Sequence, residues 1–196
     1  MTYKRDIEFL FELGSLRNMQ RGWIQHLATD CANDLEHTMR VMWLALILAR
    51  KHGNCDEAKI LKMAMIHDLA ETRTSDLSYI QKVYVKANEE KAAHDLLDQT
   101  QINDFEDVWQ EYEKRDCIEA KIVKDADNLD VDLELKELEE RGQGLPKKWE
   151  TFRKLVRDEK LHTQEARDFW DELQEADPSD WHLQANKWVK MPETGR

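Results

Sequence analysis

Glycine and proline, the residues that most often end helices and form turns, are scarce in this chain. Its 196 residues include Gly 6 and Pro 3, whereas charged residues make up 36% of the total. Few positions suit tight turns, so long helices with charged outer faces are expected. No segment shows the alternation of a half-buried strand, and the sequence therefore predicts an all-α fold. Hydrophobic residues, 41% of the chain, suffice for the core of one domain.

Hydrophobic periodicity and turn residues place the expected helices. Asp34 is a good N-cap for a helix over residues 35–51, which Gly53 ends, and this helix is apolar nearly all round. A second helix begins at Asp56 and continues through residues 61–72. A helix that is apolar on every side belongs in the centre of a fold. Further helices are expected over residues 6–16, 86–97, 105–112 and 119–141, with Ile7, Leu10 and Phe11 on one face of the first.

The C-terminal part of the chain continues the helical pattern. Two glycines, Gly142 and Gly144, close the long helix before it, and a final helical region follows. We expect residues 1–144 to form the core and residues 145–196 to form a C-terminal helical extension packed on the same domain. The tail after Trp188 is expected to be loose.

Charge and cysteine usage narrow the range of partners and the compartment. A formal net charge of -12 argues against non-specific binding of nucleic acid or of an anionic membrane, because both need a basic face. The longest apolar run, from Val41 to Ala49, is shorter than the roughly 20 residues that span a bilayer. The three cysteines are odd in number and lack CxxC spacing, so no disulfide framework is expected. A reducing, cytoplasmic location fits this pattern.

One His-Asp pair stands inside an apolar stretch. His67 and Asp68 lie in the segment LKMAMIHDLAET, where a carboxylate is usually paired or bound to metal because uncompensated burial of charge is costly. His37 opens the apolar helix upstream, and Asp125 and Asp127 lie in the later long helix. Two imidazoles and two carboxylates make a mixed N/O site for one divalent cation. Spacing alone leaves Asp125 and Asp127 as competing ligands.

Glu71 follows His67 by four residues and Asp68 by three, so the three side chains share one face of a helix. A carboxylate beside a metal-bound water or a leaving group is suited to proton transfer. Each residue has a plainer interpretation when it is taken singly. A core histidine is usually just hydrogen-bonded, and an aspartate such as Asp127 usually lies on a solvated helix face.

The ordered spacing resembles the H…HD…D signature of the HD-domain metal-dependent phosphohydrolases. Here it runs through Glu36-His37, His67-Asp68 and Lys124-Asp125-Ala126-Asp127. The local context is similar to the 5'-deoxynucleotidase branch of small HD proteins. That branch has a Trp fourteen residues before the first His, and a Glu and an Asp four and nine residues after the second. The residues at these positions are Trp23, Glu71 and Asp76, and the resemblance covers residues 5 to 140 approximately.

This resemblance implies an HD-domain helical bundle with a central buried helix pair, and it implies roles for the site residues. One divalent metal ion (Co, Mn, Ni, Fe, Zn or Mg) would be held by His37, His67, Asp68 and Asp127, the last chosen by the match to a Lys-x-x-Asp helix. Glu71 would deliver or relay a proton to the leaving oxygen. Asp76 would accept a hydrogen bond from the sugar 3'-hydroxyl. Arg21, with Arg17, would hold phosphate, and Trp23 would wall the sugar-phosphate site.

The activity that the resemblance implies is removal of phosphate from the 5' position of (deoxy)nucleotides, by attack of a metal-bound water on phosphorus. The expected partner is therefore a small-molecule nucleotide, with neither nucleic acid nor a membrane involved. Relatives are often dimers, so a homodimer is also an expectation.

The sequence alone also leaves other functions possible. Ser75 replaces the usual Gly before Asp76, and Gly22 rather than an arginine precedes Trp23. These departures leave room for nucleoside di- or triphosphates, or for a specialised nucleotide of a biosynthetic pathway. A di-iron HD oxygenase needs extra histidines between the HD pair and the last Asp, and only His94 lies there. A non-catalytic nucleotide-binding protein is the remaining alternative.

Overall fold

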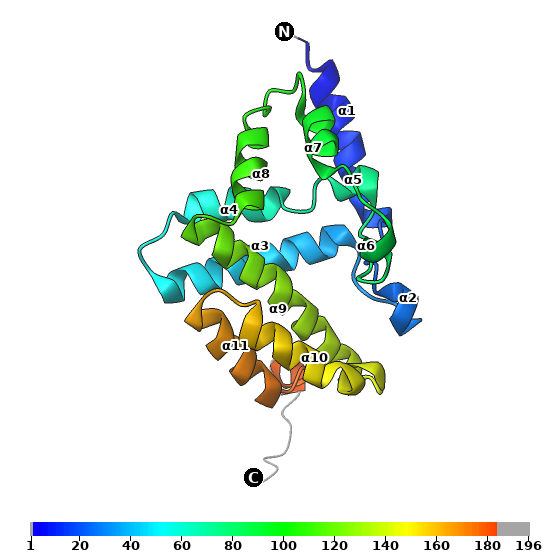
Figure 1. Cartoon of the computed structure of the whole chain (residues 1–196), viewed down its shortest axis with the longest axis vertical. Coiled ribbons are helices and arrows are strands. Elements are labelled where there is room, and N and C mark those ends of the chain that lie inside the picture. Colours follow the sequence, from blue (N-terminus) through cyan, green and yellow to red (C-terminus); the bar gives the residue numbers. More distant parts are fainter. Residues whose placement is uncertain (1, 184–196) are drawn as a thin grey trace.

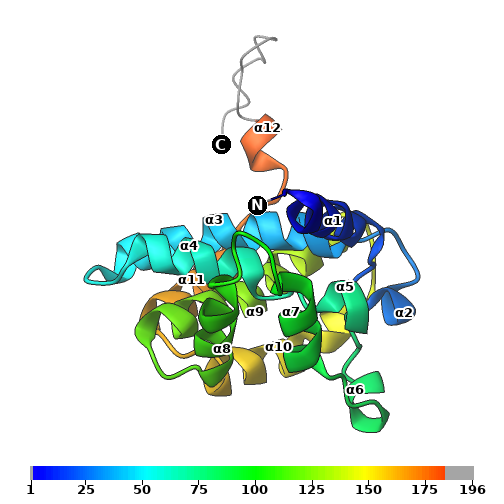
Figure 2. The ribbon, with the colours of Figure 1, turned by 90° about the horizontal axis from the view of Figure 1, so that it is seen from above.

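The computed structural model describes residues 2–183, and within them helices pack together without any β-strand (Figure 1). The predicted all-α fold is confirmed, and Figure 2 shows the same helices from above. The expected loose tail after Trp188 lies outside the described residues. Along the chain the elements are α1 (Lys4–Leu13), the 3₁₀-helix η1 (Gly14–Asn18), α2 (Ile24–Leu27), α3 (Asp34–His52), α4 (Glu57–Ile66), α5 (Glu71–Thr74), α6 (Gln81–Tyr84), α7 (Glu89–Leu97), α8 (Phe105–Lys114), α9 (Ile118–Glu140), α10 (Leu145–Glu159), α11 (Gln164–Glu175) and α12 (Asp180–Leu183).

Three helices form the centre of the bundle. Helix α3 packs against both α4 and α9, and α9 crosses it diagonally in the view of Figure 1. The core between them is mainly aliphatic, and Val41, Ile60 and Ile122 are each fully buried in it. Aliphatic side chains that interdigitate at this density give the three helices a fixed relative position. None of the helices within residues 2–183 combines the length and apolarity that a bilayer crossing requires.

The start of α3 differs from the prediction by one residue. Asn33, not Asp34, is the N-cap: its side-chain oxygen accepts hydrogen bonds from the backbone N–H groups of Leu35 and Glu36. The Glu36 carboxylate accepts the backbone N–H of Asn33 in return, which completes a capping box. Asp34 is thereby released from capping, and its side chain turns into the interior, where it is fully buried.

The prediction of a continuous helix over residues 61–72 is wrong, because α4 ends at Ile66. The next peptide groups bond three residues back, as in the 3.0 Å bond from Leu69 N–H to Ile66 carbonyl and the 3.0 Å bond from Glu71 N–H to Asp68 carbonyl. Such bonding tightens the backbone and changes the direction of successive side chains. His67 and Asp68 therefore stand at a junction between α4 and α5 and not in mid-helix.

The first helix uses a different face from the one that periodicity indicated. Phe9 is the buried residue of α1, and it packs with Leu69, Leu96 and Trp109 in a second core cluster. Ile7 and Phe11 are exposed, with 79% of the Phe11 surface accessible. The expected face of α1 is therefore wrong, since a stripe of apolar residues does not identify which side meets the core.

The C-terminal helices α10 and α11 are attached to α9 by buried polar contacts. The Asp125 carboxylate accepts hydrogen bonds from His162 N–H at 2.7 Å, from Thr163 N–H at 2.8 Å and from the Thr163 hydroxyl at 2.7 Å. Arg153 of α10 donates two hydrogen bonds to Asp132 of α9, at 2.8 and 2.7 Å. These contacts fix both helices on the face of α9. The division of the chain at residue 144 stays a prediction.

Replacing Asp125 with alanine is expected to lower the free energy of unfolding by about 3 kcal/mol, because buried N–H and O–H donors lose their acceptor. Urea denaturation followed by circular dichroism measures this loss. The matched control is Asp158→Ala, which removes a half-exposed carboxylate from α10. Equal stability of the two variants would show that Asp125 does not attach the C-terminal helices.

Candidate active site

Four predicted ligand residues come together where α3, the α4–α5 junction and α9 meet. One side-chain donor atom from each of His37, His67, Asp68 and Asp127 lies within 4.8 Å of all the others. The Nε2 atoms of His37 and His67 are 3.3 Å apart, and the Nε2 atom of His37 is 3.2 Å from an Asp127 oxygen. The Nε2 atom of His67 is 3.1 Å from an Asp68 oxygen. Two nitrogens and two carboxylates therefore converge on one point.

The tautomer of each imidazole follows from its other ring nitrogen. Nδ1 of His67 lies 2.8 Å from the Ala64 carbonyl, which can only accept a proton. Nδ1 of His37 lies 2.6 Å from a carboxylate oxygen of Asp130. Both Nδ1 atoms therefore carry hydrogen, and both Nε2 lone pairs point at the cluster. Lone pairs and carboxylates at such distances repel unless a cation lies between them, so this donor set fits a divalent metal ion.

In a metal-free site, protonation of His37 relieves part of this repulsion. Burial and Arg21 oppose the charge on His37, but hydrogen bonds to Asp127, Asp130 and Asp68 outweigh them and raise the pKa of His37 well above its usual range. Asp127 shows the complementary effect. Although burial opposes its charge, Lys124 and His37 hold the pKa of Asp127 well below its usual range. Either a proton or a metal ion therefore balances the negative charge of the cluster.

Asp127 and Asp125 have clearly different surroundings. Lys124 Nζ binds the Asp127 Oδ2 atom at 2.6 Å, which leaves Oδ1 facing His37. The Asp125 carboxylate is occupied by the segment before α11, as described above. The structure therefore brings Asp127, and not Asp125, to the cluster.

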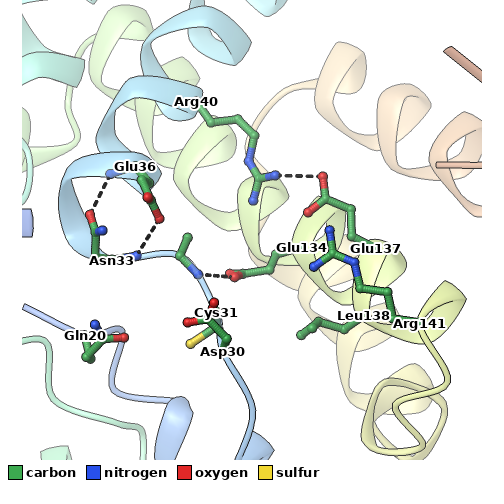
Figure 3. Close-up of a pocket in the computed structure, with 11 residues that line it drawn as sticks. Gln20, Asp30, Cys31, Asn33, Glu36, Arg40, Glu134, Glu137, Leu138 and Arg141 are labelled. Atoms are coloured by element: carbon green, nitrogen blue, oxygen red, sulfur yellow. Dashed lines mark hydrogen bonds and ion pairs between the residues drawn. The ribbon is translucent and has the colours of Figure 1, made fainter. Parts of the chain in front are cut away.

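A polar pocket of about 390 Å³ lies between the loop before α3, helix α3 itself and the C-terminal half of α9, and it is shown in Figure 3. Arg40 lies in its wall, bound to Glu137 at 3.1 Å and also to Asp130, the partner of His37. The chain Arg40–Asp130–His37 fixes the orientation of the His37 ring, in the way that outer partners commonly orient metal-binding histidines. Asp130 and Arg40 were not among the residues singled out from the sequence.

Arg21 is the buried cation beside the cluster. Its Nη1 atom lies 3.2 Å from an Asp68 oxygen, 3.3 Å from an Asp76 oxygen and 3.9 Å from an Asp34 oxygen. Although burial opposes its charge, the charges of Asp76 and Asp68 raise the pKa of Arg21. Arg17 has a different location, because it is exposed in η1 and no ion pair joins it to the cluster among the described residues.

The role of Gly22 could not be recognised from the sequence, in which this residue is only a departure from the family pattern. Its N–H donates a 3.0 Å hydrogen bond to the Asp76 carboxylate. A Cβ atom on Gly22 would lie 2.6 Å from the Asp76 carbonyl oxygen and 2.6 Å from the Ser78 nitrogen. Only glycine allows these two backbone segments to approach so closely. The close approach holds Asp76 beside Arg21.

Two further carboxylates are buried near Arg21. Burial, together with the charges of Asp68 and Asp76, raises the pKa of Glu71 to about 10. Burial also raises the pKa of Asp34 to about 7, and neither of its oxygens has a hydrogen bond from a described residue. One oxygen each from Asp34, Glu71 and Asp76 lie within 4.8 Å of one another. Without a bound cation, Glu71 therefore holds its proton at neutral pH and can act as an acid.

An opening of about 160 Å³ leads to the cluster between α5, α6, α8 and α9. His67, Asp68 and Glu71 lie on its wall. Three cationic residues, Lys82, Arg115 and Lys124, also line it, together with two further carboxylates, Glu89 and Glu113. Arg115 lies over the Tyr112 ring at 3.3 Å from the centroid, and its Nη1 atom is buried with no hydrogen-bond partner in the described part of the chain. An anion that enters this opening can bind this Arg115 nitrogen beside the four converging donors.

Trp23 and His94 are not part of the group of four converging donors. Trp23 lines a separate apolar pocket with Tyr79 and Trp149. His94 is exposed on α7, where it binds Glu106 of α8 at 3.0 Å. The described residues therefore add no third histidine to the cluster.

Asp34→Asn is expected to stabilise the metal-free protein at pH 8 by roughly 2–4 kcal/mol and to have little effect near pH 4. The folded protein keeps the Asp34 proton up to about pH 7, whereas the unfolded chain loses it near pH 4. Stability of the wild type therefore falls as pH rises through this interval, and asparagine removes the loss. Thermal melting at both pH values measures the effect, with the exposed Asp30→Asn as control. Superimposable melting curves of wild type and Asp34→Asn at pH 8 would contradict it.

Comparison with known proteins supports the resemblance drawn from the sequence. The model of the HD domain family matches residues 13–175. The chain is 28% identical over 154 residues to the 5'-deoxynucleotidase HDDC2 of Danio rerio, covering 74% of this chain and 75% of that one. It is 28% identical over 155 residues to the protein of the same name from Dictyostelium discoideum, covering 72% and 82%. A conserved hypothetical protein from Pyrococcus furiosus superposes with a TM-score of 0.74 at 27% identity, over 87% of this chain and 99% of that one. The chain belongs to the HD-domain family.

Proposed function

We propose that the protein is a metal-dependent phosphohydrolase that removes phosphate from the 5' position of (deoxy)nucleotides. The observation that carries the proposal is the convergence of the His37 and His67 Nε2 lone pairs with two carboxylates, beside Glu71 and an opening that Arg115 and Lys82 line. The related proteins named 5'-deoxynucleotidase support the choice of substrate.

The proposed ligands of one divalent metal ion are His37, His67, Asp68 and Asp127. When bound, such an ion activates water and offsets negative charge on a phosphoryl group. Asp130 and Lys124 position the ligand atoms, through the Nδ1 atom of His37 and the Oδ2 atom of Asp127. The ligand set is compatible with Co, Mn, Ni, Fe, Zn or Mg, and cellular availability decides among them.

The other residues of the site serve the substrate. Glu71 delivers its proton to the leaving 5'-oxygen, which suits a carboxyl group whose pKa burial has raised. Asp76 Oδ2 is held by Gly22 and Arg21, so Oδ1 remains to accept a hydrogen bond from the sugar 3'-hydroxyl. Arg21 and Arg115 bind phosphate oxygens from two sides. Arg17, which is exposed, is less suited to this role.

A small soluble nucleotide is the proposed substrate, in the cytoplasm and without nucleic acid or membrane partners. The net charge of -12 supports this, because a protein so acidic repels polyanions. Di-iron chemistry lacks support, since His94 is tied to Glu106 at the surface.

A homodimer is also part of the proposal. Met39, Trp43 and Ile47 follow one another at four-residue spacing on α3, and more than half of each side chain's surface is exposed. Such a stripe on a helix is a typical self-association surface.

The direct test is phosphate release from chelator-stripped protein, supplied in turn with Mn, Co, Ni, Zn and Mg. The substrates are ribo- and deoxynucleoside mono-, di- and triphosphates. We expect metal-dependent release that favours deoxynucleoside monophosphates. Release confined to di- or triphosphates would show that these, and not monophosphates, are the substrates. No release with any metal would reject the proposed hydrolase.

Two variants are expected to separate metal binding from proton delivery. Asp68→Ala should lose both the metal and the activity, because one of four ligands is removed. Glu71→Gln should keep the metal and lose about 10²- to 10⁴-fold in kcat, the usual contribution of a general acid. Metal content by mass spectrometry and steady-state kinetics check both. Loss of metal from Glu71→Gln would instead make Glu71 a ligand.

A further inference from the structure

A second cavity lies beside the candidate active site, and its chemistry is unlike that of the site. It encloses about 420 Å³ between α2, the loop before α6, α9 and α10. Its wall is almost wholly aromatic or aliphatic, and is made by Trp23, Tyr79, Val131, Trp149, Phe152 and Arg153. A cavity of this size matches the range typical of small-molecule sites.

The aromatic rings in the wall meet at different angles. Trp23 and Trp149 have planes 9° from parallel with centroids 6.5 Å apart. Tyr79 meets Trp149 nearly edge-on at 81°, and Phe152 lies 6.5 Å from Tyr79. Tyr79 and Phe152 each remain 57% exposed. These rings form the sides of an open box, with faces still available for a planar ligand.

The charged residue in the cavity wall, Arg153, is already neutralised. Arg153 donates two hydrogen bonds to Asp132 and one, at 2.8 Å, to the Asn128 carbonyl. Its guanidinium is therefore fixed and does not make the cavity an anion site. The Trp23 indole N–H is buried without a hydrogen-bond partner among the residues described, which leaves a donor for a polar edge of a ligand.

The cavity is directly next to the proposed metal and sugar positions. Val131 follows Asp127 by four residues on α9, about 6 Å along the helix. Trp23 follows Gly22, whose N–H holds Asp76, and Tyr79 follows Asp76 by three residues. The proposed acceptor of the sugar 3'-hydroxyl thus lies between the metal ligands and the aromatic box. A nucleotide has its phosphate, sugar and base in the same order.

We infer that the aromatic box formed by Trp23, Tyr79, Trp149 and Phe152 binds the nucleobase of the substrate by stacking. The inference rests on the proposed function for the identity of the phosphate and sugar positions. Stacking accepts every base because each has a π-face, so the box favours nucleotides over base-free sugar phosphates and discriminates weakly among bases.

The test compares two substrates in three proteins: wild type, Tyr79→Ala and Phe152→Ala. For each protein, kcat/KM is measured with a deoxynucleoside 5'-monophosphate and with 2-deoxyribose 5-phosphate, which lacks the base. The ratio of the two values is expected to fall about tenfold in each variant, mainly through KM of the nucleotide, as one stacking contact is lost. Tyr84→Ala is the matched control, because Tyr84 is 84% exposed and lies outside the cavity wall.

Binding of a nucleoside without phosphate provides a readout that needs no turnover. Saturation-transfer NMR with 2'-deoxyadenosine should show contact with wild type and with Tyr84→Ala, and a clearly weaker signal with Tyr79→Ala. Nucleoside binding without phosphate release from any substrate would overturn the proposed function and uphold the box. An unchanged ratio and equal nucleoside signals in all the proteins, while phosphate is released, would overturn the box alone. Absence of both activities would overturn both.

Discussion

The folded chain holds four metal-binding donor groups close enough together to repel one another, and the rest of the site depends on how this repulsion is balanced. The Nε2 atoms of His37 and His67 are 3.3 Å apart, each with its lone pair fixed inward by a bond at Nδ1. Asp68 and Asp127 add negative charge at the same point. Burial of this kind is costly unless a cation neutralises it. The aliphatic core of α3, α4 and α9 holds the donors in place, so the energy of the fold maintains a site that is complete only with a positive ion.

The side chains around this cluster differ in charge and polarity from one side to another. Arg21 lies between the proposed metal ligand Asp68 and the carboxylates of Asp76 and Asp34, which keeps the proposed sugar acceptor and the converging donors in one network. Arg115 and Lys82 place positive charge at the opening instead. Beyond Asp76 the polar character ends abruptly at Trp23 and Tyr79. The positions proposed for phosphate, sugar and base thus each have an environment of matching polarity within a short length of chain.

Much of this could be predicted from the sequence, where periodicity and motif order carry the information. The central position of α3 and the grouping of His37, His67 and Asp68 were recognisable in this way. Spacing could not separate Asp127 from Asp125, because the difference lies in Thr163, a partner distant in sequence. Nor could it reveal the break after Ile66, the buried side chain of Asp34 or the need for Gly22, which depend on bonds between segments that meet only in the folded chain. The exposed face of α1 shows the same limit for packing.

The most direct measurement is anomalous diffraction from crystals grown with Mn²⁺, with data collected on both sides of the manganese absorption edge. The account predicts a strong anomalous peak within bonding distance of His37 Nε2, His67 Nε2, Asp68 and Asp127 Oδ1. The coordination positions that the protein leaves free on the manganese ion should face Arg115 and Glu71. Crystals that contain manganese yet show no peak among these four side chains, or show it at Asp125, would contradict the account.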